Sequence, residues 1–185
     1  MREPAGPTDE TLALRTRKGD LAAFEALARR YQSRLYSYAL RIVGDAHEAE
    51  DLTQESLLRA FRSLARFDPK QRFAGWLFGI ATHVCRDWLR RRGRRREHAS
   101  DAAEQAVVER TPREEAAAAE ERENVLEAVR RLPLKYREVI VLHYLEEMSY
   151  DEVADSLGIR PDAARRRALR AREMLRRYLA AHGQS

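Results

Sequence analysis

Cysteine is almost absent from this sequence: Cys85 is the only one in 185 residues. A single cysteine excludes an intramolecular disulfide and fits a reducing compartment. The sequence also lacks any run of about 18 apolar residues, and the opening MREPAGPTDE has no apolar segment typical of a secretory signal. We therefore expect a cytoplasmic protein with no stable membrane insertion.

Groupings typical of catalysis or metal binding are missing as well. No glycine-rich phosphate loop is present, and the histidines show no metal-ligand spacing with carboxylates or with Cys85. The histidines are His47, His83, His98, His143 and His182. The sequence thus predicts no enzyme, no cofactor and no metal site.

Positive charge is plentiful, since 35 lysines and arginines outnumber 30 acids and leave a net charge of +5. A basic chain favours a polyanionic partner, although charge alone does not separate nucleic acid from a membrane surface or an acidic protein. The length has room for two small helical modules.

The first half has the pattern of amphipathic helices. From Asp20 apolar residues recur every three or four positions, as far as Gly44, a typical left-handed helix end. Asp45 followed by Glu48 is the carboxylate form of a capping box, so a second helix is expected from 45 to about 64. A loop over 67–73 precedes a third helix, which ends in the basic run RRRGRRR at 90–96.

Residues 97–120 lack aromatic and large aliphatic side chains other than valine, and Pro112 interrupts them. Such a segment buries too little surface to offset its ordering entropy, so we interpret it as a flexible linker. The predicted organisation is an N-terminal tail and lead-in (1–19), a first domain (20–96), the linker (97–120), a second domain (121–180) and a tail (181–185).

The second domain also has helical patterning. Ser149 and Glu152 form an S-x-x-E capping box, Gly158 ends that short helix, and Pro161 lies where the first turn of the next helix tolerates proline. No strand pattern occurs in either half. The predicted fold class is all-α, with two small helical domains.

The last helix is rich in arginine. With 3.6 residues per turn, Ala164, Ala168 and Ala171 share a packing side, and the arginines cover the rest. A short helix, a glycine turn and a basic helix are typical of a helix-turn-helix, in which the second helix enters the major groove. The alternative is a solvated basic helix with no ligand. Against it, few acids offset the arginines, and like charges on one face repel one another.

Residues 130–173 resemble region 4 of the extracytoplasmic-function (ECF) sigma factors, a group within the sigma-70 family. The family pattern is LP, an arginine four residues on, an apolar stretch, S-x-x-E-[IV]-A, LG and a basic helix. The matching residues are Leu132, Pro133, Arg137, Ser149, Glu152, Val153, Ala154, Leu157 and Gly158.

The first half is similar to region 2 of the same family. DLTQESLLRAFRSL, residues 51–64, resembles the segment that docks on the coiled coil of the largest polymerase subunit. FAGWLFGIATHVCRDWLRR, residues 73–91, resembles the segment that contacts the minus-10 element, with His83 in place of the usual asparagine. The aromatic residues of this segment are interpreted as mainly structural. Leu52, Leu58 and Phe61 are the candidates for the packing side of the 51–64 helix.

The resemblance implies an RNA polymerase sigma factor that recognises minus-10 and minus-35 promoter elements and helps to open the duplex. It implies three partners: core RNA polymerase, promoter DNA and an anti-sigma factor. Core polymerase would be bound by Asp51, Gln54 and Glu55, and the minus-10 DNA by Lys70, Arg72, His83, Asp87, Arg90 and Arg91. The minus-35 DNA would be bound by Arg165, Arg166, Arg170, Arg172 and Arg176. The rival interpretation is a freestanding helix-turn-helix repressor or activator, in which the acidic face at 51–55 has no use.

Overall fold

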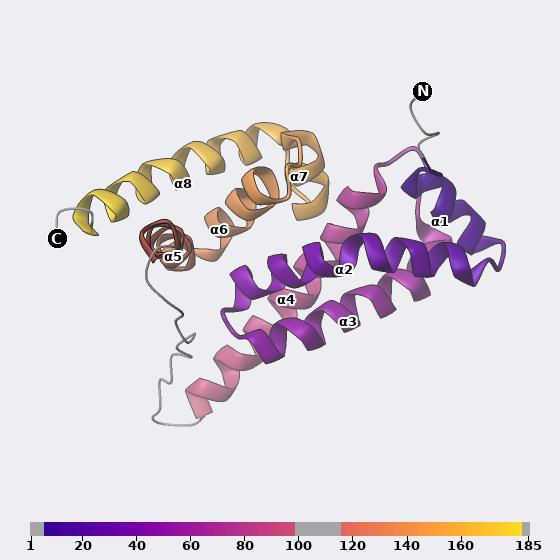
Figure 1. The fold of residues 1–185 in the computed structure, drawn as a ribbon, viewed down its shortest axis with the longest axis horizontal. Helices are drawn as coiled ribbons and strands as arrows, with labels where there is room; N and C mark the ends of the chain where they lie inside the picture. Colours follow the sequence, from indigo (N-terminus) through magenta and orange to yellow (C-terminus); the bar gives the residue numbers. More distant parts are fainter. Residues whose placement is uncertain (1–5, 99–115, 183–185) are drawn as a thin grey trace.

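The computed structural model describes residues 6–98 and 116–182, and all their regular structure is helical (Figure 1). The elements are α1 (Asp9–Arg17), α2 (Leu21–Val43), α3 (Ala46–Ser63), η1 (Leu64–Arg66), α4 (Phe73–His98), α5 (Ala116–Arg131), α6 (Leu134–Ile140), η2 (Val141–Leu145), α7 (Tyr150–Leu157) and α8 (Pro161–His182). The all-α prediction is confirmed. None of the helices in these two ranges is long and apolar enough to span a bilayer.

The predicted helix ends of the first unit, α1 to α4, are present. The Asp20 side chain accepts the Ala23 amide at the start of α2, and Gly44 ends α2 in the left-handed conformation with φ 76°. Asp45 accepts the Glu48 amide at the start of α3. These ends were predictable because a cap involves residues only two or three positions apart.

Helix α1 lies within residues 1–19, which were predicted as a tail and lead-in with no helix assigned. Leu12, Ala13 and Thr16 of this helix are buried against the rest of the unit. The segment has little amphipathic pattern of its own, so the contacts that order it are tertiary.

The aromatic residues of the first unit form its core beside the 67–73 loop. The Phe67 and Phe73 rings lie 5.5 Å apart, and Tyr31 and Trp76 lie at 5.5 and 5.7 Å from Phe73. Phe67 and Phe73 are almost fully buried. The interpretation of Phe73 and Trp76 as structural residues agrees with this packing.

The second unit, α5 to α8, contains the predicted helix-turn-helix. Ser149 and Glu152 complete a reciprocal capping box on α7, and Gly158 ends that helix with φ 64°. The predicted linker, 97–120, overlaps helix at both ends, because α4 extends to His98 and α5 begins at Ala116. Residues 99–115 of that prediction lie outside the described residues.

The two units pack against each other, with α4 on α7. The Ser156 hydroxyl donates to the Gly75 carbonyl at 2.8 Å, and a Cβ on Gly79 would lie 3.4 Å from the Ser156 carbonyl oxygen. Three ion pairs cross the same boundary: Arg86 to Glu138, Arg34 to Glu146 and Arg72 to Glu152. Gly79 therefore permits a close approach of the α4 and α7 backbones. The ion pairs add charged contacts between the same two units.

Candidate functional site

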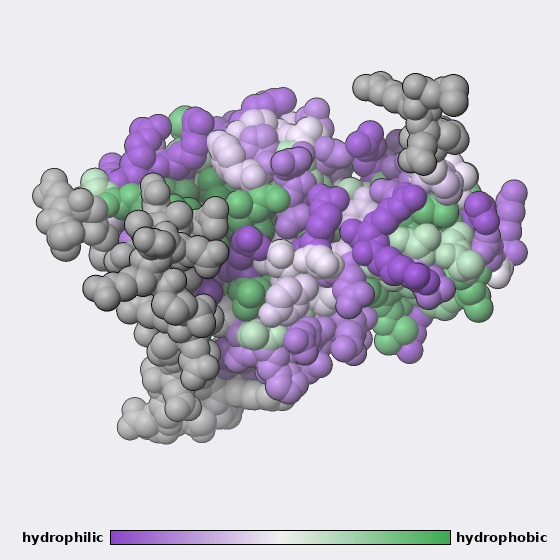
Figure 2. Space-filling view, viewed as in Figure 1, coloured by the Kyte–Doolittle hydropathy of each residue, from purple (hydrophilic) through white to green (hydrophobic). Residues whose placement is uncertain are grey.

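The arginine helix α8 presents the predicted basic surface. Ala164, Ala168 and Ala171 are at most 1% exposed, which fixes the side that packs on α6 and α7. The five predicted minus-35 residues are all exposed: Arg165, Arg166, Arg170, Arg172 and Arg176. In Figure 2 hydrophilic residues follow the outer edge of α8, and hydrophobic residues lie beneath it, toward α5 and α6.

Nearby carboxylates contact two of these arginines. Arg165 donates to Asp162 at 3.0 Å and lies 3.9 Å from Asp151, and Arg170 donates to Glu173 at 2.9 Å. Exposed pairs of this kind contribute only about 0–1 kcal/mol. A phosphate or a base edge can therefore displace the carboxylates, and the surface remains available to an anion.

Helix α3 carries the predicted acidic face. Asp51 and Gln54 are exposed and Glu55 is half-buried, so the three side chains remain accessible on one helix side. Leu58 and Phe61 are 42% and 41% exposed, so the expectation that they pack inward is wrong for Leu58 and only partly met by Phe61, whose ring lies 4.9 Å from that of Phe24 on α2. The inner side is instead formed by Ala49, Leu52, Thr53, Ser56 and Ala60.

Between α3 and α4 lies an open groove of about 490 Å³, lined by Arg59, Arg62, Ser63, Arg66, Ile80 and His83. We call it the α3–α4 groove. The His83 Nδ1 atom is 2.7 Å from the Gly79 carbonyl oxygen, so Nδ1 is the donor in the neutral ring. The groove combines cationic walls with an apolar side chain and an imidazole.

Sequence reasoning found only His83 of these groove residues. Arg59 and Arg62 of α3 and Arg66 of η1 recur at steps of three and four, a spacing that favours one helix side. That signal was visible in the sequence. The arginine spacing indicates a groove only if α4 lies beside α3, and helical periodicity alone does not reveal this.

A chain of charges joins the acidic face to the groove. Arg59 Nε donates to Glu55 Oε1 at 2.6 Å, and Arg59 Nη1 lies 3.5 Å from Asp87 Oδ2. Asp87 also accepts from Arg90, and this hydrogen bond, with a smaller contribution from Arg59, holds the pKa of Asp87 below its ordinary value. The predicted polymerase and minus-10 residues are thus neighbours.

A second hollow at the end of α4 is lined by Asp87, Arg90, Arg91 and Arg94. Because three arginines surround one carboxylate, the hollow carries net positive charge. Such a surface favours the binding of a phosphate group. The side chains of Arg95 and Arg96, which belong to the same predicted basic run, lie outside the described residues.

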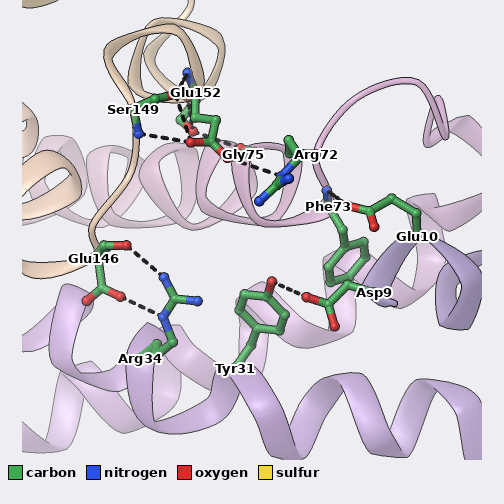
Figure 3. A network of polar contacts seen from close by, with 11 residues as sticks. Asp9, Glu10, Tyr31, Arg34, Arg72, Phe73, Gly75, Glu146, Ser149 and Glu152 are labelled. Atoms are coloured by element: carbon green, nitrogen blue, oxygen red, sulfur yellow. Dashed lines mark hydrogen bonds and ion pairs between the residues drawn. The ribbon is translucent and has the colours of Figure 1, made fainter. Parts of the chain in front are cut away.

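The loop before α4 holds the other two minus-10 candidates. Lys70 is exposed, and Arg72 reaches across to α7, where its Nε lies 3.4 Å from Glu152 Oε1 (Figure 3). The structure therefore gathers His83, Asp87, Arg90 and Arg91 along α4, whereas Arg72 is held by the second unit.

The remaining reactive groups form no site of their own. Within the described part of the chain, no cluster of three or more histidine, cysteine, aspartate or glutamate residues could hold a metal ion. Cys85 is buried, and this burial raises the pKa of its thiol to about 12. A thiol in this state is inert at neutral pH.

Comparison with known proteins matches both units to one family. The Sigma-70 region 2 model matches residues 27–95, and the Sigma-70, region 4 model matches residues 122–175.

Two curated relatives extend that likeness over nearly the whole chain. ECF RNA polymerase sigma factor SigE of Mycolicibacterium smegmatis is 37% identical over 183 residues, 95% of this chain and 71% of that protein. ECF RNA polymerase sigma factor SigW of Bacillus subtilis is 33% identical over 174 residues, 88% of this chain and 92% of that protein.

Solved structures share the arrangement of helices. CnrH, in complex with the cytosolic domain of CnrY, superposes with a TM-score of 0.72 at 29% identity, covering 94% of this chain and 97% of that chain. The sigma factor RpoE, in complex with the anti-sigma factor NepR from Bartonella quintana, superposes with a TM-score of 0.74 at 23% identity, covering 85% and 96%. The second likeness concerns the fold alone.

Proposed function

Because the chain belongs to the ECF subfamily of sigma-70 RNA polymerase sigma factors, we propose that its two units bind the minus-10 and minus-35 promoter elements through the surfaces described above. As a sigma factor it directs transcription initiation and is a non-catalytic subunit of RNA polymerase. The observation that carries the residue assignments is the exposed arginine surface of α8, together with the α3–α4 groove in the other unit.

Helix α8 enters the major groove at the minus-35 element. Arg165, Arg166 and Arg170, in the first half of the helix, meet the base edges, since a guanidinium can donate two parallel hydrogen bonds to guanine. Arg172 and Arg176 lie farther along and meet the phosphate backbone. The small residues Ala164 and Ala168 support this role because they bring α8 close to its own unit and leave the arginines outward.

The α3–α4 groove receives the melted minus-10 strand. Opening a duplex requires an unpaired base to be held outside the stack, and a site that binds this base offsets the few kcal/mol of unpairing. Ile80 and His83 offer a surface for a base, and Arg62 and Arg66 neutralise its phosphates. The DNA contacts continue on either side of the groove, through Lys70 and Arg72 in the loop and through residues 87–91 of α4.

Core polymerase binds the acidic face of α3. Asp51, Gln54 and Glu55 supply polar contacts, and the exposed Leu58 and Phe61 add apolar area on the same helix. An apolar centre with a charged rim is the usual composition of a protein interface. Because this face lies away from the contact between the units, it remains accessible in the packed arrangement.

The two units must separate before both promoter elements are bound. Elements centred near minus 10 and minus 35 lie about 25 base pairs apart, or ~85 Å at 3.4 Å per pair. Helix α8 has 22 residues and spans roughly 33 Å. Since α7 contacts α4 in the structure, α8 lies beside the first unit, and in this proposal the units move apart to reach both elements. The packed arrangement is then the unbound form.

A partner that holds the units together would keep the protein inactive. CnrH, which is 29% identical to this chain, was solved in complex with the cytosolic domain of CnrY, so we infer a protein partner here, and the family resemblance makes an anti-sigma factor the candidate. The protein would act in the cytoplasm, where polymerase and promoters are found. The functional domains are residues 20–96, extended by α1, and residues 121–180, joined by the connecting segment.

In vitro transcription tests the proposal. The purified chain is added to core polymerase free of other sigma factors, and start sites are mapped across genomic DNA. The expected result is a set of transcripts whose promoters share two sequence elements. Binding of duplex DNA without polymerase, with no association with core, would instead favour a freestanding helix-turn-helix regulator.

A paired substitution tests the groove. Arg62→Ala should reduce promoter opening by the holoenzyme, whereas Arg29→Ala, on an exposed part of α2 in the same unit, should not. Equal opening by both variants would remove the α3–α4 groove from the proposal.

A further inference from the structure

Helix α4 begins without a capping side chain of its own. Its first residue is Phe73, and the preceding Arg72 has a guanidinium, which cannot accept a hydrogen bond. The Phe73 amide donates instead to Glu10 Oε1 of α1 at 3.1 Å (Figure 3). A residue 63 positions earlier in the chain thus supplies the cap and places negative charge at the positive end of α4.

The other end of the loop is tied to the same helix. Arg17 Nη1 donates to the Phe67 carbonyl oxygen at 3.4 Å, so the loop over 67–73 is bonded to α1 where it starts and where it ends. Between these points Asp68 Oδ1 accepts the Lys70 amide at 3.0 Å, and the Arg72 side chain lies 3.4 Å from Glu152 of α7. The conformation of the exposed loop therefore depends on α1.

Helix α1 is itself fixed on α2. Tyr31 donates to Asp9 Oδ2 at 2.6 Å, and Arg30 donates to Asp9 Oδ1 at 2.7 Å. Leu12 and Ala13 are buried beneath these bonds. The Tyr31 ring also lies 5.5 Å from the Phe73 ring, so α2 contacts both α1 and the residue that α1 caps.

We propose that Glu10 and Arg17 are positioning residues for promoter opening: through α1 they hold the backbone of the 67–73 loop in the conformation from which Lys70 meets the melted strand, and from which Arg72 does so once its pair with Glu152 of α7 has opened. This inference rests on the proposed function, because it takes the loop to be a DNA contact. Fixing the loop beforehand spares its ordering entropy when the strand binds, and that saving is the benefit of preorganisation.

Substitutions of Glu10 separate positioning from general stability. Glu10→Ala removes the acceptor, and Glu10→Gln keeps an oxygen that can accept from the Phe73 amide. The matched control is Asp45→Ala, because Asp45 caps α3 in the same unit and lies outside the loop. Both alanine variants lose one cap and are expected to lower the melting temperature by similar amounts.

Promoter opening by the holoenzyme is measured by permanganate reactivity of the minus-10 thymines. Two templates are compared: a duplex promoter, on which this reactivity reports opening, and the same promoter with the natural non-template strand opposite a mismatched template strand. Holoenzyme affinity is measured on the mismatched template, because its thymines are already unpaired. We expect Glu10→Ala to open the duplex about five-fold less than wild type, as the loss of a typical cap predicts. Glu10→Gln should recover most of this loss, and Arg17→Ala should reduce opening in the same direction.

The outcomes distinguish this inference from the proposed function. Opening by each variant is first corrected for its affinity for core polymerase. Equal corrected opening by Glu10→Ala and Asp45→Ala would overturn the positioning role. So would a five-fold defect that disappears on the mismatched template, because the loop would then not contact the melted strand. If the wild-type chain itself opens no promoter, the proposed function fails before the variants are compared.

Discussion

Arg86 and Glu138 form a two-bond ion pair between the units: Nε donates to one carboxylate oxygen at 2.6 Å and Nη2 to the other at 2.7 Å. Arg86 belongs to α4 and Glu138 to α6, and the Glu138 side chain is 1% exposed. A carboxylate buried this deeply needs its partner, because an unpaired buried charge is costly. The first unit therefore supplies the charge that the second unit requires in the packed arrangement.

Glu138→Gln should favour separation of the units. It leaves Arg86 beside a neutral amide, and breaking a buried pair typically costs about 3–5 kcal/mol. Arg86 regains water when the units part, so the radius of gyration from X-ray scattering should increase. Glu127→Gln, which removes a half-exposed partner of Arg131, is the control and should leave the radius unchanged.

Gly79→Leu should separate the units by a steric route. Even a Cβ on Gly79 would lie 3.4 Å from the Ser156 carbonyl oxygen and 3.5 Å from its Cα, so a leucine side chain has no room beside α7. The control is Gly93→Leu on the same helix, where nothing lies within 4 Å. Fluorescence energy transfer between labels on α2 and α8 should fall only for Gly79→Leu. An unchanged signal would contradict the close approach.

Arg166→Ala should lower transcription from the cognate promoter. A bidentate contact to guanine contributes about 1–3 kcal/mol of discrimination, so the loss is on the order of 5- to 150-fold and should be accompanied by relaxed preference at one minus-35 position. Arg176→Ala, a proposed backbone contact, should weaken all promoters alike and reduce the salt dependence of binding. Unchanged transcription by Arg166→Ala at physiological salt would count against the assignment.

Asp51→Ala combined with Glu55→Ala should weaken core binding and leave the fold intact. Asp51 is exposed, and Glu55 makes only a half-exposed pair with Arg59, so neither supports the core. Affinity for core polymerase is measured by fluorescence titration, and folding by circular dichroism. Glu25→Ala, on the exposed part of α2, is the control. Full core affinity of the double variant would contradict the acidic-face assignment.

Cys85 should make the protein less stable at alkaline pH. Burial raises the pKa of this thiol from 9.0 to about 12, so the unfolded chain loses its proton first. Stability is therefore full below pH 9 and falls between pH 9 and 12, by about 1.4 kcal/mol per pH unit from this group. Cys85→Ala should show a shallower fall in unfolding experiments over the same range. Parallel curves for the two proteins would show that the thiol is not the cause.

Local signals in the sequence predicted much of the fold. Gly44, Asp45 and the Ser149–Glu152 box all act within a few residues, so their patterns identify the ends of α2, α3 and α7. Helix α1 was missed because Glu10 and Asp9 bond to partners more than 20 positions away. Nothing local in the sequence distinguishes Gly79, which faces α7, from Gly93, which faces open space.

The candidate site was predictable to the same extent. The alanine spacing of α8 identified its outward arginines, since one helix carries the whole pattern. Leu58 was placed on the wrong side, and Phe61 packs only partly, against Phe24, because an exposed apolar residue and a core residue look alike in a sequence. The α3–α4 groove needs two helices side by side, so only the structure could unite Arg62 with His83.

The charged contacts between the units make the packed arrangement sensitive to ionic strength. Arg72 is 77% exposed where it meets Glu152, so dissolved ions screen this pair strongly, whereas they screen the Arg34–Glu146 pair less because Glu146 is 4% exposed. Loss of the first pair loosens the packed form. The same ions compete with arginine for DNA phosphates and weaken promoter binding. Salt thus favours separation of the units but weakens their binding to DNA. Promoter occupancy should therefore pass through a maximum at an intermediate salt concentration.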